Sequence, residues 1–430
     1  MLILILGANN FCHILASELC KEGHDICVIS EHATLLEHLQ QYIDCQTIVG
    51  CPSHPQVLRQ ANADNADMII AATQNDEMNM VACQVAYSLF SIKRKIAFIS
   101  NAHYLVRHEL FSNNNMPIDT MVSIENIISE QLSELLAFST GYLHTDFPHS
   151  NLCMTLTTVL NPKFCGIYLA NLTDKISTIA IFRDNEYLEA KQDTILQEGD
   201  QIIFLSDKHL VRKLAAEIHG PTSDCKRIMI GADPGVIDDF LRIHSNLQTK
   251  VIEPCVNNCE IIANKHPTAT VLNGDITEYE LLCSENMKKI DVFCAITSDD
   301  EDNIMAALQA KDLGADKTIA MVSKKHYQNM LNNSTIDFIL DPNDRVIEQV
   351  LTHVKHPWIK NVHKIPLNNH KIVELYSTYE INKSQLKDFR VIAYINGTEF
   401  EPEDIIPSKT TILIHFENDI SLSVFENRIP

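Results

Sequence analysis

Ala71-Ala72-Thr73-Gln74-Asn75-Asp76-Glu77-Met78-Asn79 recurs further along the chain as Ala295-Ile296-Thr297-Ser298-Asp299-Asp300-Glu301-Asp302-Asn303. Both stretches follow the pattern Ala-x-Thr-x-x-Asp-Glu-x-Asn, and 297 − 73 gives a separation of 224 residues. The same separation holds for three further pairs: Gly7 with Gly231, Gly50 with Gly274, and Asp67 with Asp291. One separation maintained over so long a span predicts the duplication of a whole folding unit.

Each copy alternates short apolar runs with amphipathic stretches such as Asp76–Phe90. The apolar runs predict strands at Leu2–Leu6, Asp25–Ser30, Gln46–Val49, Met68–Ala72 and Ile96–Ile99, and then at Arg227–Ile230, Lys250–Glu253, Thr270–Leu272, Val292–Ile296 and Thr318–Val322. Strands that alternate with helices indicate a parallel sheet covered by helices on both faces. Continuous apolar runs are typical of strands buried on both sides.

A smaller module follows each predicted sheet. Helical patterns at about Ile124–Ser139 and Pro342–His356 come first. Residues 150–206 are then strand-like, with turns at Asn161-Pro162 and Gly199-Asp200, and Lys208–Ile218 reads as a short helix. A weaker version occupies 359–430. The prediction is an α/β fold of two Rossmann-like, doubly wound parallel-sheet domains, each followed by a small α+β domain, with boundaries at 1–140, 141–220, 225–356 and 357–430.

The composition restricts the partners. With 34 basic and 56 acidic residues, the net charge is −22, and no basic run is longer than Lys93-Arg94-Lys95. Nucleic acids and anionic lipids both attract clustered Lys and Arg, so neither is expected to bind. No stretch of about 20 apolar residues predicts a membrane helix, and Met1–Gly7 lacks the basic region of a signal peptide. We expect a cytosolic protein that reaches a membrane only through a protein partner.

The thirteen cysteines have irregular spacing, which fits reduced thiols in the cytosol. Cys255 and Cys259 come nearest to a metal-binding pattern, but no second pair of ligands follows at zinc-site spacing. No metal site is expected.

The first copy carries a reduced form of the dinucleotide-binding turn Gly-x-Gly-x-x-Gly, whose glycines let the backbone approach a pyrophosphate. It reads Gly7-Ala8-Asn9-Asn10-Phe11-Cys12, so only the first glycine is present. The turn is electrically neutral and does not exclude phosphate. The second strand ends at Ser30, where an acidic residue would bind the adenosine ribose.

The second copy has lost different parts of the motif. Its turn reads Gly231-Ala232-Asp233-Pro234-Gly235-Val236, which places a carboxylate where the pyrophosphate belongs. At about 4 Å, two like charges near a protein surface repel by roughly 4 kcal/mol. Glu253 nevertheless supplies the acid at the end of the second strand. The first copy is therefore the better predicted phosphate binder.

Thr73 and Thr297 follow the fourth strand of each copy, at the sheet edge where such folds bind ligands. The repeated threonine segment therefore favours ligand binding. The alternative is that Thr, Asp and Glu in this segment only cap the helix that follows.

Taken together, these segments resemble the bacterial Trk potassium-uptake regulatory proteins, which carry two RCK (or KTN) modules, each a Rossmann domain followed by a small TrkA-C domain. The resemblance is carried by Ser53–Arg59, Asp67–Phe90, Glu198–Phe204 and Thr297–Ala310. It implies a regulatory, non-catalytic protein at the cytoplasmic face of the bacterial inner membrane, bound to a potassium-translocating membrane subunit. It also implies that NAD or NADH, or else ATP or ADP, binds the Rossmann domains. Two modules per chain suggest dimers or tetramers that close a ring.

The resemblance also assigns candidate nucleotide-binding positions. These are Gly7, Ala8, Asn9, Asn10, Phe11, Ser30, Thr73, Gln74 and Phe98 in the first copy, and Gly231, Ala232, Asp233, Pro234, Gly235, Glu253 and Thr297 in the second. The chain departs from the family at Ser30, where an Asp is expected, and at Lys409-Thr410, which replaces the Gly-Asp turn of the last small domain.

Two other functions fit parts of the sequence. A nicotinamide-dependent dehydrogenase would need a substrate domain with a clustered acid or base, and the small modules show no such set. A nucleotide-insensitive scaffold of the same transport system would keep the duplicated fold while its binding turns decayed.

Overall fold

The structure is a computed structural model of the 430-residue chain. It describes residues 1–112, 114–137, 141–147, 151–172, 176–184, 186–220, 225–331, 334–354, 359–364, 371–377, 379–382, 390–395, 405–406, 408 and 410–416. The described residues divide into two compact units, one over Met1–Ile127 and one that begins at Ile128.

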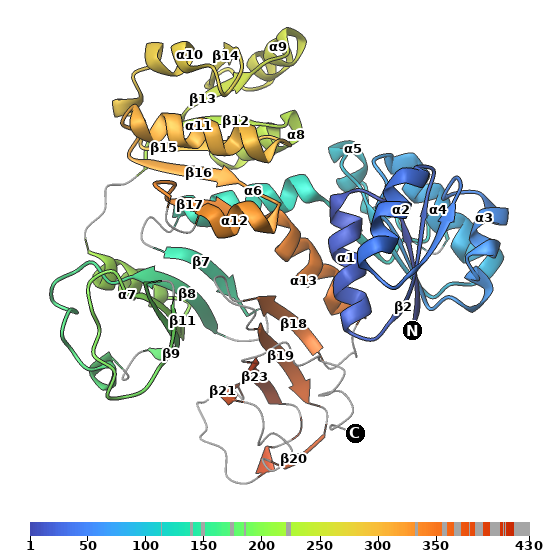
Figure 1. The fold of residues 1–430 in the computed structure, drawn as a ribbon, viewed down its shortest axis with the longest axis horizontal. Helices are drawn as coiled ribbons and strands as arrows, with labels where there is room; N and C mark the ends of the chain where they lie inside the picture. Colours follow the sequence, from blue (N-terminus) through green and yellow to red (C-terminus); the bar gives the residue numbers. More distant parts are fainter. Residues whose placement is uncertain are drawn as a thin grey trace. The chain divides into compact units, whose positions relative to one another are not determined.

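A six-stranded parallel sheet forms the centre of the first unit (Figure 1). Its strands are β1 (Leu2–Leu6), β2 (Asp25–Ser30), β3 (Gln46–Val49), β4 (Met68–Ala71), β5 (Arg94–Phe98) and β6 (Thr120–Val122). They lie in the order β3-β2-β1-β4-β5-β6, which is the doubly wound order of the Rossmann fold. The predicted fold class is confirmed, but β6 was missed because three residues are too short a run to show a pattern.

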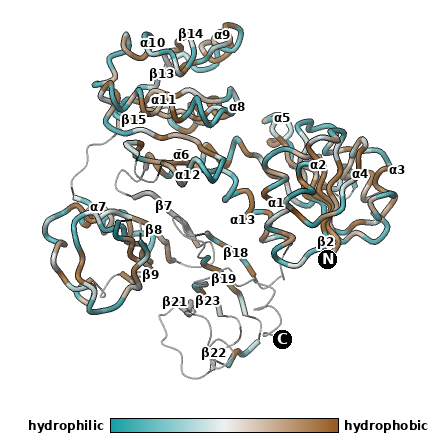
Figure 2. Tube along the Cα trace, in the orientation of Figure 1, coloured by the Kyte–Doolittle hydropathy of each residue, from teal (hydrophilic) through white to brown (hydrophobic). Residues whose placement is uncertain are grey.

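The helices of this unit are α1 (Asn10–Lys21), α2 (Ala33–Tyr42), α3 (Pro55–Gln60), α4 (Asp76–Phe90), α5 (Ala102–Leu105) and two 3-10 turns, η1 (Ala63–Asn65) and η2 (His108–Leu110). The strands are hydrophobic along their length in Figure 2, and the residues of β4 are completely buried. Burial on both faces explains why the strands read as unbroken apolar runs.

A second parallel sheet repeats this order in the second unit. Its strands are β12 (Arg227–Ala232), β13 (Gln248–Glu253), β14 (Thr270–Asn273), β15 (Val292–Ile296), β16 (Lys317–Met321) and β17 (Phe338–Leu340), ordered β14-β13-β12-β15-β16-β17. Its helices are α8 (Pro234–Ile243), α9 (Val256–Lys265), α10 (Tyr279–Ser284), η4 (Met287–Lys289), α11 (Asp300–Asp312), α12 (Lys325–Leu331) and α13 (Pro342–Val354). The predicted duplication of the sheet is therefore visible strand by strand.

Two small antiparallel sheets belong to the same unit. The first contains β7 (Gly141–Asp146), β8 (Leu152–Thr158), β9 (Ser177–Arg183), β10 (Glu186–Glu189) and β11 (Gln201–Asp207), accompanied by η3 (Leu169–Leu172) and α7 (Val211–His219). The second contains β18 (Ile359–Lys364), β19 (Lys371–Ser377), β21 (Arg390–Ile395) and β23 (Thr410–Phe416), with a separate pair β20 (Ile381–Asn382) and β22 (Ile405–Ile406). Ile372 and Leu413 share a hydrophobic cluster with Leu156 and Ile203, so the two small sheets pack on each other.

The turn at Gly199-Asp200 depends on both of its residues. Gly199 adopts a positive φ of 87°, which favours glycine. Asp200 is buried and accepts two hydrogen bonds from the Arg183 guanidinium, each 2.8 Å long. In the second small sheet Thr410 begins β23, and Lys409 lies outside the described residues.

Several predicted boundaries were wrong by one to three residues. The predicted strands Met68–Ala72, Ile96–Ile99 and Thr318–Val322 are Met68–Ala71, Arg94–Phe98 and Lys317–Met321. Polar residues at the start of the last two hid their true beginnings. The helix predicted at Lys208–Ile218 begins at Val211, because residues 208–210 form a turn. The described parts of helix α6 (Ile124–Ala137) and of α13 agree with the predicted helices, and the predicted last two residues of each lie outside the described part of the chain.

Candidate functional site

The turn between β1 and α1 requires a glycine at its first position. Gly7 has a φ of 117°, and a Cβ atom there would lie 2.6 Å from the carbonyl oxygen of Ala72. Both the dihedral angle and the close approach exclude a side chain. Ala8 then leads into α1, whose first residue is the exposed Asn10. The backbone therefore has the tight turn into a helix N-terminus that dinucleotide-binding folds use.

Asn9 caps helix α1. Its Oδ1 atom accepts a hydrogen bond of 2.9 Å from the Cys12 N–H, and its Nδ2 atom donates one of 3.4 Å to the Ala72 carbonyl. The capping oxygen accepts from one of the N–H groups to which a phosphate would otherwise bind, so that donor is already used. Cys12 is fully buried beside Gly7, and burial raises the pKa of its thiol to about 12. Cys12 thus packs where the third glycine of the motif would lie.

Four other predicted residues belong to the first module. Ser30, at the end of β2, is buried and accepts a hydrogen bond of 3.2 Å from the His32 N–H. The rings of Phe11 and Phe98 contact each other at 4.9 Å between centroids, and both are buried. These two aromatic residues therefore bury each other. Gln74 is exposed.

Thr73 is held by Asn79, a buried residue that sequence reasoning had not assigned to the site. The Oδ1 atom of Asn79 accepts from the Thr73 N–H at 3.0 Å and from the Thr73 hydroxyl at 2.6 Å. Its Nδ2 atom donates to the carbonyl oxygens of Thr73 at 3.0 Å and Phe98 at 2.9 Å. All four hydrogen-bonding positions of the amide are used. The recurrence of Asn in both copies was the signal that could have identified it.

The second copy repeats this network around Thr297 and Asn303. Asn303 accepts from the N–H and hydroxyl of Thr297 and donates to the carbonyl oxygens of Thr297 and Met321, all between 2.8 and 3.0 Å. In both copies the helix cap is supplied by the residue before the Asp-Glu pair, Asn75 or Asp299.

The Asp of the Asp-Glu pair has a different role. Asp76 accepts from the N–H groups of Ser100 and Asn101, and Asp300 accepts from those of Ser323 and Lys324. The repeated segment is thus a clamp that joins the carboxyl ends of adjacent strands.

Gly231 is not the structural equivalent of Gly7. It lies within strand β12 in extended conformation, and a Cβ atom there would collide with the side chain of Ile276. Ala232 ends the strand and the exposed Asp233 precedes α8, without capping it through its side chain. Pro234 and Gly235 are the first two residues of α8. Gly231 is therefore required by the close packing of Ile276 and not by a left-handed backbone conformation.

Glu253 is directed into its own loop. It is buried, and its Oε1 atom accepts from the Cys255 N–H at 2.9 Å and from Asn258 Nδ2 at 3.2 Å. The Cys259 thiol donates to the Glu253 carbonyl at 3.2 Å. In the described part of the chain no group of three or more His, Cys, Asp or Glu side chains lies close enough to hold a metal ion.

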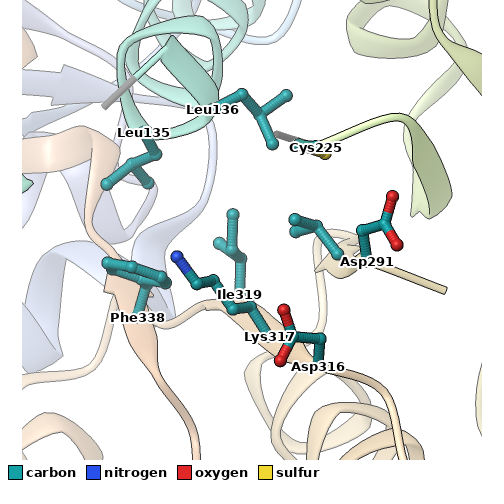
Figure 3. A pocket seen from close by; sticks show the side chains of 9 residues that line it. Leu135, Leu136, Cys225, Asp291, Asp316, Lys317, Ile319 and Phe338 are labelled. Carbon is teal, nitrogen blue, oxygen red and sulfur yellow. The ribbon is translucent and has the colours of Figure 1, made fainter. Parts of the chain in front are cut away.

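The second unit also contains a cavity of about 20 Å³, far from the predicted ligand edge. Figure 3 shows Leu135 and Leu136 of α6 facing Lys317, Ile319 and Phe338 across it. Phe338 and Lys317 begin their strands, so the cavity lies at the amino ends of the sheet. Burial lowers the pKa of Lys317 and raises that of the neighbouring Cys225 to about 11. A space of this size holds about one water molecule.

The sequence profile of the TrkA-N domain matches residues 3–124 and 236–342, which is one match for each sheet. The chain is 30% identical over 428 residues to the Trk system potassium uptake protein TrkA of Haemophilus influenzae, covering 96% of this chain and 93% of that one. It is 31% identical over 420 residues to TrkA of Halomonas elongata, covering 96% and 90%.

The chain belongs to the TrkA family. It is a potassium-uptake component with two RCK modules, as the resemblance implied. Membership in TrkA, a regulatory rather than a catalytic family, excludes the dehydrogenase alternative. Among the described residues, no helix of the TrkA-family chain is long and apolar enough to cross a membrane.

Solved RCK structures have the same fold. The RCK domain of GsuK superposes with a TM-score of 0.63 at 16% identity, covering 99% of this chain and 94% of that one. The GsuK channel bound to NAD gives a TM-score of 0.64 at 15% identity, covering 99% and 78%. At this identity the likeness shows that this TrkA-family chain shares the tandem RCK architecture.

Proposed function

We propose that this chain is the nucleotide-sensing regulatory subunit of a Trk-type potassium uptake system. It binds a potassium-translocating membrane subunit at the cytoplasmic face of the inner membrane and assembles as a dimer or tetramer. The observation that carries the sensing function is the first turn. Gly7 at a φ of 117°, with the N-terminus of α1 directly behind it, keeps the geometry of a pyrophosphate site.

The ligand class is a nucleotide with two or more phosphates: NAD, NADH, ATP or ADP. GsuK, which shares the fold, has been solved bound to NAD and bound to ADP. The first module is the binding module, because Asn9 leaves its turn uncharged. The second module has the carboxylate of Asp233 at the same place, and a carboxylate repels phosphate oxygens.

Regulation follows from differential binding. A ligand shifts a conformational equilibrium only to the extent that it binds one state more tightly than the other. The nucleotide touches a turn whose position is tied to β4 through the close contact between Gly7 and Ala72. A nucleotide that moves this turn would therefore also move the end of β4, because Gly7 and Ala72 are in close contact.

A nucleotide-insensitive scaffold is the second candidate, and two observations favour it. Ser30 offers no carboxylate to a ribose, and Glu253 already accepts two hydrogen bonds within its own loop. In this reading both modules keep the fold for assembly with the membrane subunit alone.

Calorimetry and transport distinguish the two candidates. The purified chain is titrated with NADH, NAD, ATP and ADP, and we expect one site per chain. Rubidium uptake is then measured in vesicles that contain the Trk-type membrane subunit of the same genome, with and without the chain and the nucleotide that binds. Uptake that changes with nucleotide only when the chain is present supports sensing. No binding at millimolar concentration, with uptake that still depends on the chain, would establish the scaffold.

A further inference from the structure

The hydroxyl group of Thr73 has one proton and two acceptors for it inside the chain. The Oγ1 atom lies 2.6 Å from Asn79 Oδ1 and 3.2 Å from the carbonyl oxygen of Asn75. Asn79 is fully buried, so its oxygen has no water to replace that bond. The proton of Thr73 is therefore committed to the protein and is not available to a ligand.

The oxygen of Thr73 keeps acceptor capacity. A hydroxyl oxygen has two lone pairs, and among the described residues only the Asn75 N–H, at 3.3 Å, points toward it. Thr73 is partly exposed, so a ligand can reach it. It also directly follows Ala72, the residue whose carbonyl contacts both Gly7 and the Asn9 amide. A molecule seated on the Gly7–Asn10 turn therefore lies beside Thr73.

We propose that Thr73 is a specificity-determining residue that accepts a hydrogen bond from a donor group of the ligand, and that Asn79 is the positioning residue that fixes this polarity. The assignment rests on the proposed nucleotide-sensing function and adds to it the chemistry of one contact. Thr73 binds a ribose hydroxyl or the amide NH₂ of a nicotinamide. It does not bind a phosphate oxygen, which can only accept.

The second module provides a matched control. Thr297 has the same internal bonds, to Asn303 at 2.9 Å, to the Asp299 carbonyl at 3.4 Å and from the Asp299 N–H at 3.3 Å. A Thr→Val substitution removes the hydroxyl at nearly the same shape in either module. Loss of internal bonds is then equal in the two variants, and only the variant in the ligand-binding module loses a ligand contact.

The test is a set of calorimetric cycles with Thr73→Val, Thr73→Ser and Thr297→Val. The probes are ADP, 2′-deoxy-ADP, 3′-deoxy-ADP, NADH and the NADH analogue in which an acetyl group replaces the carboxamide. We expect Thr73→Val to weaken the natural ligand about three- to tenfold and to leave affinity for one analogue, the one that lacks the donor, unchanged. Thr73→Ser should bind like the unaltered chain. Thr297→Val should match Thr73→Val in melting temperature and leave affinity unaltered.

Three results would overturn the assignment. If Thr73→Val weakens every analogue by the same factor as its parent, Thr73 contacts none of these donors. If added titrations with AMP and ATP show that the loss scales instead with the number of phosphates, the polarity is wrong. If the unaltered chain binds no probe, the proposed function and this assignment fail together, and that pattern differs from the first two because both of those include binding by the unaltered chain.

Discussion

The side-chain nitrogen of Asn79 lies 2.9 Å from the carbonyl oxygen of Phe98, so a residue of helix α4 ties the end of strand β5 to the turn that follows β4. Asn303 makes the same connection to Met321 in the second module. The separation is 224 residues between the asparagines but 321 − 98 = 223 between their partners. The connection before the fifth strand is thus one residue shorter in the second module, and the hydrogen bonds of the asparagine are nevertheless the same in both modules.

Replacement of Asn79 by Ala should therefore loosen the ligand edge of the first module. Four hydrogen bonds disappear, and the partly buried carbonyl of Thr73 and the buried carbonyl of Phe98 lose their donor, which costs about 2–4 kcal/mol of local stability. Hydrogen exchange followed by mass spectrometry should show faster exchange at the Thr73 amide. Asn303→Ala should affect only the second module. Gln84→Ala, which removes one hydrogen bond to Ser88 from the same helix, serves as control. Unchanged exchange in Asn79→Ala would contradict the clamp.

Gly7 and Gly231, which are 224 residues apart in the repeat, should respond differently to a second mutation. Gly7→Ala and Gly231→Ala each introduce a clash, and each should lower the melting temperature of its module. Adding Ile276→Val to Gly231→Ala should recover part of the loss, because the clash there is with a flexible side-chain end. The clash at Gly7 is with backbone at a φ of 117°, and no side-chain trimming relieves it. Strictly additive effects of Gly231→Ala and Ile276→Val would show that Gly231 is required for another reason.

A charge exchange between the modules tests which turn binds phosphate. Asn9→Asp keeps an effective helix cap but introduces a carboxylate, so we expect nucleotide affinity to fall about tenfold. Asp233→Asn is the reciprocal change and should leave the tight site unaltered while raising any weak binding at the second module. Calorimetry at low and high salt measures both, and the loss in Asn9→Asp should shrink as salt rises. An affinity unaffected by Asn9→Asp would place the phosphates elsewhere.

Asp341, which precedes helix α13, makes stability depend on pH. Burial and the neighbouring Asp344 raise its pKa from 3.8 to about 6, against hydrogen bonds from Gln328 and the Asn343 N–H that favour the carboxylate. The folded state holds this proton more tightly than the unfolded state, so its stabilising contribution is complete below pH 3.8 and is lost as pH rises to about 6.

Asp341→Asn should remove that dependence. The variant should be more stable than the unaltered chain at pH 7, by on the order of 2 kcal/mol, and should lose this advantage at pH 4. Urea unfolding at pH 4, 5, 6 and 7 measures the slope. Asp316→Asn, which replaces an exposed acidic residue of the same unit, is the control. Equal slopes in the variant and the unaltered chain would show that Asp341 does not titrate in this window.

Sequence alone determined the duplication, the class of fold and the family. These depend on local properties of the sequence. An unbroken apolar run predicts a buried strand of a parallel sheet, and the separation shared by Thr73, Gly7 and Gly50 is visible in the sequence itself. The sixth strands β6 and β17 were not predictable in this way. They are three residues long, and their strand conformation comes from pairing with β5 and β16 rather than from their own pattern.

The contacts of the candidate site residues were decided by tertiary structure. Gly7 and Gly231 are the same letter at the same place in the repeat, but one is required by a left-handed dihedral angle and the other by the side chain of Ile276, 45 residues further along the chain. The carboxylate of Glu253 accepts hydrogen bonds from its own loop, and the sequence gives no sign of these contacts. The hydroxyl of Thr73 could donate or accept, and its hydrogen bond to Asn79 fixes it as a donor within the protein. In each case the deciding contact joins residues whose proximity only the folded chain creates.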